Sequence, residues 1–175
     1  MSTWNIDKAH SEIGFKVKHL MISTVKGQFT SFEGSLDLPD NNLEKAVVSF
    51  SADATSINTG NEMRDNHLRS ADFFNSDLFP VISFKSKDIK KKEGNTFKVV
   101  GDFTMHGITK EITLDVVFNG VTTGMDGIKV TSFEISGSLN RKDYGLLWNA
   151  PIEQGGVVVS DEVKLDINAE FKEVQ

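Results

Sequence analysis

The chain has 175 residues, 38% hydrophobic and 25% charged, which suits one soluble globular domain. The formal net charge of −6 argues against nucleic-acid binding, because phosphate recognition needs clustered Lys and Arg. The chain contains no Cys, which excludes disulfides and thiolate metal sites.

Alternation of apolar and polar residues with a period of two dominates the pattern along the chain. From Glu12 to His19 it places Ile13, Phe15, Val17 and His19 on one face of a predicted strand. Alternation of this kind is typical of antiparallel sheets with one polar face. Further strands are predicted over residues 25–38, 46–52, 81–88, 97–105, 112–118, 128–139 and 163–171.

One segment, residues 59–70, breaks this alternation and has helix-forming character. Thr59 or Asn61 is suited to cap the helix, and Met63 and His67 would share one of its faces. A polar loop over residues 71–79 follows and carries three Phe. We therefore expect one short helix near residues 60–70, followed by a Phe-rich loop.

About eight antiparallel strands in one chain must solve the problem of exposed sheet edges. Closure into a barrel removes the edges, so we predict an all-β fold, an eight-stranded antiparallel β-barrel formed by a single domain of residues 1–175. The interior of such a barrel is either packed with side chains or holds one small ligand. Thirteen Phe suit an apolar interior, but they fit a packed core equally well.

The residues Arg64, Asp65, His67 and Arg69 form the one cluster suited to chemistry. Three roles are open: attachment of the helix to the barrel, recognition of a ligand's polar head, or catalysis with His67 as general base. On a helix Asp65 and His67 project to different faces and cannot pair, whereas Asp65 and Arg69 are spaced to do so. We therefore expect no catalytic residue.

Four His residues raise the question of a metal site. His10, His19, His67 and His106 lack the short ligand spacings of zinc motifs. We expect no metal site and no cofactor. His19 continues the inward stripe of its strand, so it would either hydrogen-bond a ligand carbonyl or amide, or end the strand as an ordinary core histidine.

Several spaced blocks of the sequence resemble the YceI-like family over essentially the whole chain. They comprise residues 4–11 (WNIDKAHS), 15–19, 27–34, 56–59, 64–70 (RDNHLRS), 72–74, 79–86, 101–110 (GDFTMHGITK), 140–145 (NRKDYG) and 155–163. The resemblance implies a lipocalin-like eight-stranded barrel whose interior binds polyisoprenoids, isoprenoid quinones or fatty-acid amides, often in a dimer. It also favours a cavity over a packed core.

The function expected from this resemblance is binding, transport or sequestration of one long-chain apolar lipid inside the barrel, without enzymatic activity. The alternatives are an isomerase or hydrolase acting on such a lipid through Arg64, Asp65 and His67, and a packed barrel that acts through protein partners. The expected ligand-binding residues are Phe15, Val17, His19, Phe29, Phe50, Met63, His67, Phe74, Phe84, Phe103, Met105 and Leu114.

The expected partner is therefore a long-chain apolar small molecule, with no nucleic acid, and both a monomer and a homodimer stay open. No apolar run approaches the ~20 residues that span a bilayer, so stable membrane insertion is not expected. Residues 1–7 hold neither a basic nor an apolar targeting segment. This predicts a cytoplasmic protein, or a periplasmic or secreted one if a leader has been removed.

Overall fold

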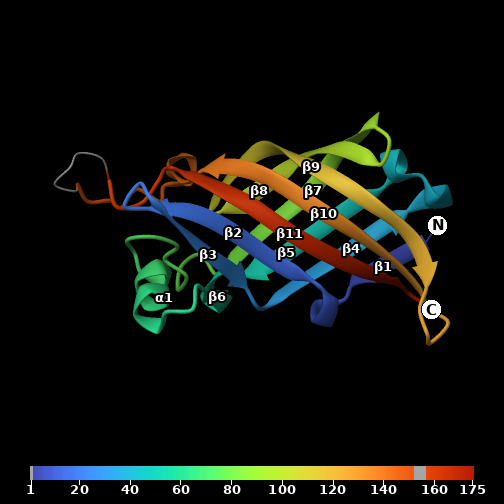
Figure 1. The fold of residues 1–175 in the computed structure, drawn as a ribbon, viewed down its shortest axis with the longest axis horizontal. Coiled ribbons are helices and arrows are strands. Elements are labelled where there is room, and N and C mark those ends of the chain that lie inside the picture. Colours follow the sequence, from blue (N-terminus) through green and yellow to red (C-terminus); the bar gives the residue numbers. More distant parts are fainter. Residues whose placement is uncertain (1, 152–156) are drawn as a thin grey trace.

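A computed structural model describes residues 2–151 and 157–175, which form one elongated antiparallel barrel (Figure 1). The strands are β1 (Ser2–Ile6), β2 (Glu12–His19), β3 (Ser23–Phe29), β4 (Phe32–Leu38), β5 (Val47–Asp53), β6 (Ile57–Asn58), β7 (Val81–Glu93), β8 (Thr96–Met105), β9 (Ile108–Thr123), β10 (Lys129–Asn140) and β11 (Glu162–Glu173). The helical segments are α1 (Glu62–Arg69) and the short 3₁₀ turns η1 (Lys8–His10), η2 (Pro39–Asn41), η3 (Leu43–Lys45), η4 (Ala54–Ser56) and η5 (Arg141–Tyr144).

Eight strands close the barrel in the order β1-β4-β5-β7-β8-β9-β10-β11, and β11 pairs back onto β1. β11 also pairs with β2 through residues 164–168, so β1 and β2 follow one another along β11 with η1 between them. In the same way β4 pairs with β1 and β3 with β2. The predicted all-β, eight-stranded antiparallel barrel is therefore confirmed.

The boundaries of several strands differ from those predicted. The strand expected over residues 25–38 is two strands, β3 and β4, because the chain bends at Thr30 and Ser31. There the Thr30 amide donates to the Ser56 carbonyl, and the Ser31 carbonyl accepts from the Asp53 amide, instead of continuing the β2–β3 ladder. β1 was not predicted, and β7 and β9 run several residues beyond their predicted ends.

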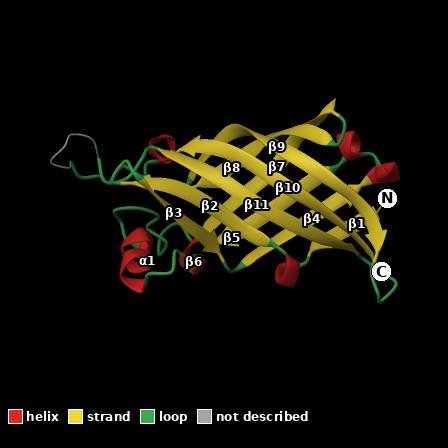
Figure 2. Cartoon of the chain, viewed as in Figure 1, coloured by secondary structure: helices red, strands yellow, loops and turns green. Residues whose placement is uncertain are grey.

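The predicted helix is present but shorter, at Glu62–Arg69. Asn61 is its N-cap, since the Asn61 side chain accepts a hydrogen bond from the Arg64 amide at 3.0 Å. Thr59, the other capping candidate, instead binds Asp65 through its amide and hydroxyl. Helix α1 lies at one end of the barrel, and both termini lie at the other (Figures 1 and 2). We call these the α1 end and the termini end.

Candidate functional site

The barrel interior contains a cavity of about 650 Å³, within the range of ~300–1,000 Å³ typical of small-molecule sites. Its wall is formed by inward side chains of strands around the whole barrel, from Ile6 of β1 to Phe171 of β11. Most of the lining side chains are aliphatic or aromatic. The interior is therefore a hollow apolar chamber rather than a packed core.

Glycines on the wall help to keep this chamber open. A Cβ atom added to Gly27 would overlap the ring of Phe15, its partner across the β2–β3 ladder. A Cβ on Gly101 would overlap the ring of Phe84. Because these two positions lack a side chain, each ring occupies the space beside the wall and takes up less of the centre.

The structure places all twelve expected ligand-binding residues on the wall of this cavity. They are Phe15, Val17, His19, Phe29, Phe50, Met63, His67, Phe74, Phe84, Phe103, Met105 and Leu114. For the nine residues on strands the period of two explains this agreement, because every second residue of a barrel strand faces inward, whereas Met63 and His67 come from α1 and Phe74 from the loop after it. Their contact with a ligand is part of the function proposed below.

Among the described residues, the side chains that line the cavity at the termini end are hydrocarbon. Phe133 stacks on Phe118 with ring centroids 5.5 Å apart, and it meets Phe171 edge to face at 5.8 Å. Phe133 and Phe171 line the cavity, and Leu43 of η3 also contributes to its wall. This end can contact a ligand only through apolar surface.

At the α1 end the wall carries rings with polar atoms. The imidazole of His67 lies edge to face with Trp148 at 4.8 Å and with Phe73 at 5.1 Å between ring centroids. Phe73 and Trp148 are 5.4 Å apart, which completes a three-ring cluster. The guanidinium of Arg141 lies 6.0 Å from the Phe73 ring. All four residues line the cavity.

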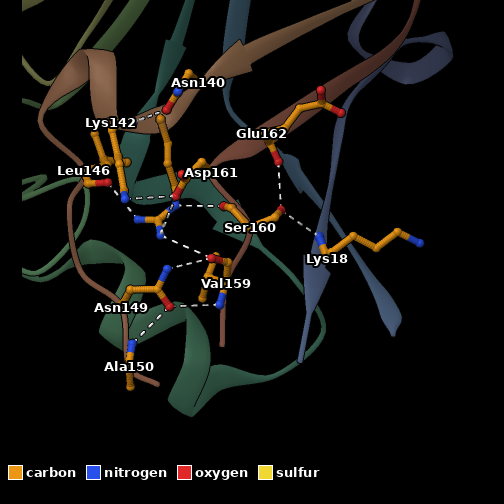
Figure 3. A network of polar contacts seen from close by, with 11 residues as sticks. Lys18, Asn140, Lys142, Leu146, Asn149, Ala150, Val159, Ser160, Asp161 and Glu162 are labelled. Atoms are coloured by element: carbon orange, nitrogen blue, oxygen red, sulfur yellow. Dashed lines mark hydrogen bonds and ion pairs between the residues drawn. The ribbon is translucent and has the colours of Figure 1, made fainter. Parts of the chain in front are cut away.

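Arg141 ties together the chain segments that approach this end, through bonds to Leu146, Val159 and Ser160, which Figure 3 labels. Its Nε donates to the Ser160 carbonyl at 2.9 Å, and its Nη1 donates to the Leu146 carbonyl at 2.7 Å. Its Nη2 donates to the Val159 carbonyl at 3.4 Å. Asn149 adds a bond to the same Val159 carbonyl and accepts from the Val159 amide, so residues 157–160 are held beside η5.

The cluster expected to carry chemistry is divided by the structure. Asp65 is buried and accepts from the amide and hydroxyl of Thr59 at 2.9 and 2.6 Å. Arg64 also binds Thr59, through Nε to the hydroxyl and Nη2 to the carbonyl. These bonds hold the start of α1 against the loop before it. They give Asp65 a structural role at the start of the helix.

The Asp65–Arg69 pair suggested by helical spacing does not form. Arg69 instead donates to the carbonyls of Thr55 and Ile57 and to the Asn66 side chain. The suggestion was wrong because carbonyls of the neighbouring η4–β6 segment satisfy the guanidinium. Arg69 therefore attaches α1 to the barrel wall, as the attachment hypothesis requires.

His67 has a carboxylate partner that helical spacing did not indicate. Its Nε2 lies 2.9 Å from an oxygen of Asp72, which is in the loop after α1. As expected, His67 does not pair with Asp65. His19 ends β2 on the cavity wall, where its backbone bridges to Val159.

Outside the cavity, Asp7, His10 and Glu170 bring their ligand-type atoms within 4.8 Å of one another. The Asp7 carboxylate lies 2.9 Å from Nδ1 of His10 and 3.3 Å from the ammonium of Lys172. Hydrogen bonding to Asp7 raises the pKa of His10, and the same bond lowers the pKa of Asp7. The group is thus held by its own opposite charges, and it is a surface ion-pair cluster.

A family model described as the YceI-like domain matches residues 4–171. The chain belongs to the YceI-like family. It is 43% identical over 172 residues to a UPF0312 protein of Staphylococcus aureus, which covers 98% of each chain. The solved YceI protein of Campylobacter jejuni is 34% identical, with a TM-score of 0.78 over 97% of this chain and 96% of that one.

Two further solved structures share the YceI-like fold at lower sequence identity. BcnA of Burkholderia cenocepacia has a TM-score of 0.80 at 19% identity, covering 94% of this chain and 98% of that one. A polyisoprenoid-binding domain from Saccharophagus degradans has a TM-score of 0.71 at 14% identity, with 97% of each chain covered. At these identities the likeness concerns the fold alone. The likeness to the Campylobacter jejuni YceI protein confirms the lipocalin-like barrel expected from the resemblance.

The twelve expected ligand-binding residues of this YceI-like chain did not include Phe73, Arg141 and Trp148, which also line the cavity. Arg141 lies in the block of residues 140–145 that carries the family resemblance, and no cavity role was expected for it. The one available signal was composition, because Arg is rare in this chain and Lys serves the solvated faces. No helix in residues 2–151 and 157–175 is long and apolar enough to cross a membrane.

Proposed function

We propose that this protein binds one long-chain apolar lipid in the barrel and carries or sequesters it. The observation that carries the proposal is the 650 Å³ cavity with a hydrocarbon wall along the barrel. Burial of an apolar chain there contributes about 0.8 kcal/mol for each methylene group removed from water. A polyisoprenoid, an isoprenoid quinone or a fatty-acid amide suits this chamber, and the description of the Saccharophagus degradans domain supports the first of these.

Organic extraction followed by mass spectrometry tests the proposal directly. Protein purified from its native host is expected to release a long-chain lipid in near-stoichiometric amount. A straight-chain ligand series should then bind about fourfold tighter for each added methylene until the cavity is full. Native protein that releases no lipid, and that binds no member of the series, would contradict a carrier function.

Phe15→Trp tests whether the cavity is the binding site. The larger ring is expected to reduce lipid loading more than it reduces the free energy of unfolding, because it fills space that the ligand uses. Lys16→Ala is the matched control, since Lys16 pairs with Asp166 and does not line the cavity. Equal loading by both variants would place the ligand elsewhere.

The second candidate function is an isomerase or hydrolase acting on the bound lipid. The observation that favours it is the His67–Asp72 pair on the cavity side of α1, because a carboxylate can orient a histidine base. His67→Ala would then abolish turnover and leave lipid loading intact. If loading and stability fall together, His67 is structural or binds the head group. The packed-barrel alternative predicted an interior without a cavity, whereas the barrel is hollow.

A further inference from the structure

The titratable side chains on the cavity wall all belong to basic residue types. The described part of the wall includes the side chains of His19, Arg64, His67 and Arg141, and it includes no Asp or Glu. Lys18 also borders the cavity, but its ammonium lies on the outward face of β2 and donates to Thr24. The chain as a whole has the opposite balance, with 25 acidic residues against 19 Lys and Arg. The cavity is therefore basic inside an acidic protein.

These basic residues gather at the α1 end. Arg64 and His67 lie on α1, while Lys18 and His19 lie at the end of β2. Arg141 begins η5 and reaches the same place, since its Nη2 binds the carbonyl of Val159, the residue that bridges to His19. The termini end of the wall contributes no titratable side chain among the residues that the structure describes.

Arg141 is the buried member of this set, with 3% of its surface exposed. Its guanidinium has five N–H groups, and its three hydrogen bonds all go to neutral backbone carbonyls. Two N–H groups are thus available for another acceptor. The carboxylate of Asp161 lies 3.9 Å away, beyond hydrogen-bond distance, is half exposed and is nearer to the ammonium of Lys142, at 3.3 Å.

The burial of this charge has an energetic consequence. Burial lowers the pKa of the Arg141 guanidinium, because desolvation disfavours the charged form, and Asp161 offsets this only in part. Arg64 donates to Thr59 and forms no ion pair with any carboxylate in the described ranges. His67 differs, because Asp72 already faces it. An anion in the cavity would compensate Arg141 and Arg64.

We propose that the ligand's head group is anionic, a carboxylate or a phosphate, and that it binds at the α1 end against Arg141 and Arg64. This inference rests on the proposed lipid-binding function and adds the chemical class and orientation of the ligand. A guanidinium forms its strongest hydrogen bonds with these two oxyanions. A quinone, an alcohol or an amide accepts a hydrogen bond but brings no negative charge to the buried guanidinium, which Asp161 compensates only in part. The apolar tail then points to the termini end.

The test compares four probes with the same sixteen-carbon chain on delipidated wild-type protein. They are hexadecanoic acid, hexadecyl phosphate, 1-hexadecanol and hexadecanamide, each titrated below its micelle concentration and followed by the fluorescence of Trp148, which lines the cavity. The better anion is expected to bind about tenfold tighter than the alcohol and the amide, or more. The order of the acid and the phosphate identifies which oxyanion the site prefers.

Variants then assign the preference to Arg141. Arg141→Met removes the charge and is expected to bring the ratio of anion to alcohol affinity close to one. Arg141→Lys keeps a positive charge and is expected to retain part of the preference for the anion. If Arg141 had a purely structural role, its substitution would weaken the binding of both probes equally and leave the ratio unchanged. Lys142→Met is the matched control, because the neighbouring Lys142 is exposed, lies outside the cavity wall and should not alter the ratio. If Arg141→Met does not fold, Arg64→Gln takes its place.

The outcomes separate the two proposals. Equal affinity of wild-type protein for all four probes would overturn the anionic head group and leave lipid binding standing. An unchanged ratio in a folded Arg141→Met variant would also overturn it. If none of the four probes binds, the proposed lipid-binding function fails with it.

Discussion

The two ends of the cavity contain aromatic clusters of similar size and opposite character. At the termini end Phe118, Phe133 and Phe171 are joined ring to ring and offer only hydrocarbon. At the α1 end His67 and Trp148 carry polar nitrogen atoms, and the buried cation of Arg141 lies beside the cluster. The regular strands of the barrel surround the first cluster, whereas a helix and loops form the second.

This difference indicates that the two ends of the barrel have separate roles. Side chains on hydrogen-bonded strands build the apolar end, and their positions are set by the ladder. The polar end depends on individual hydrogen bonds from Arg64, Arg69 and Arg141 to carbonyls of neighbouring segments. The termini end should therefore account for more of the folding stability, and the α1 end for more of the ligand selectivity.

Truncation of one ring at each end gives the largest expected contrast. Phe133→Ala removes a ring that is 6% exposed and contacts two others, so it should cost about 3–5 kcal/mol of unfolding free energy. Trp148→Ala should cost less, because Trp148 is only half-buried. Urea denaturation of both variants measures the difference. A larger loss for Trp148→Ala would reverse the assignment of stability to the termini end.

Loss of the helix cap should have a smaller and more local effect. Asn61→Ala removes the bond to the Arg64 amide and should cost about 1 kcal/mol, because that amide loses its acceptor. Amide hydrogen exchange should accelerate in α1 and stay unchanged in β8 and β9. Asn61→Asp keeps an acceptor at the cap and should behave as wild type. Faster exchange throughout the barrel would show that the α1 end is coupled to the whole fold.

The smallest expected effect concerns the Asp7–His10 cluster, which lies outside the cavity. The pKa of His10 is raised above 6.5, so the pair stabilises the fold below pH 6.5 and is lost as the pH rises through the raised value. The pKa of Asp7 is lowered below 3.8, so its contribution is present above pH 3.8 and is lost as the pH falls through the lowered value. Both therefore contribute between about pH 3.8 and 6.5.

Titration of His10 by NMR measures this directly. Asp7→Asn should return the pKa of His10 toward 6.5, since the bond to Asp7 is the largest cause of its rise. Asp166→Asn, which removes a carboxylate paired with Lys16 on the same sheet, should leave His10 unchanged. Lipid binding should not change in either variant, and a change with Asp7→Asn would connect the outer wall to the cavity.

The local sequence pattern was sufficient to predict most of the fold. Period-two alternation predicted the strands and their inward faces, and residues such as Phe15, Phe84 and Leu114 lie on the cavity wall as a result. The helix also followed from local chemistry, and of the two cap candidates, Thr59 and Asn61, the structure has Asn61. The bend between β3 and β4 could not be predicted, because it depends on backbone bonds to Asp53 and Ser56, more than twenty residues away.

The α1 end shows more clearly that local sequence patterns do not predict tertiary contacts. Helical spacing correctly excluded a pair between Asp65 and His67, but it also suggested an Asp65–Arg69 pair that does not form. It gave no sign of the His67–Asp72 pair, because Asp72 lies beyond the end of α1 in a loop whose path depends on tertiary contacts.

The sequence by itself therefore determined an all-β barrel with an apolar interior, since the side-chain period of a strand is a local property. Only the tertiary structure decided that the interior is hollow, and that its titratable lining is basic and lies at one end. Arg141 donates to the carbonyls of Leu146, Val159 and Ser160. The last two come just before β11, whereas Arg141 comes just after β10. These contacts lie just beyond the end of the β10–β11 ladder, where Asn140 pairs with Glu162, and they depend on how the chain between the two strands folds back on Arg141, so no pattern of neighbouring residues encodes them.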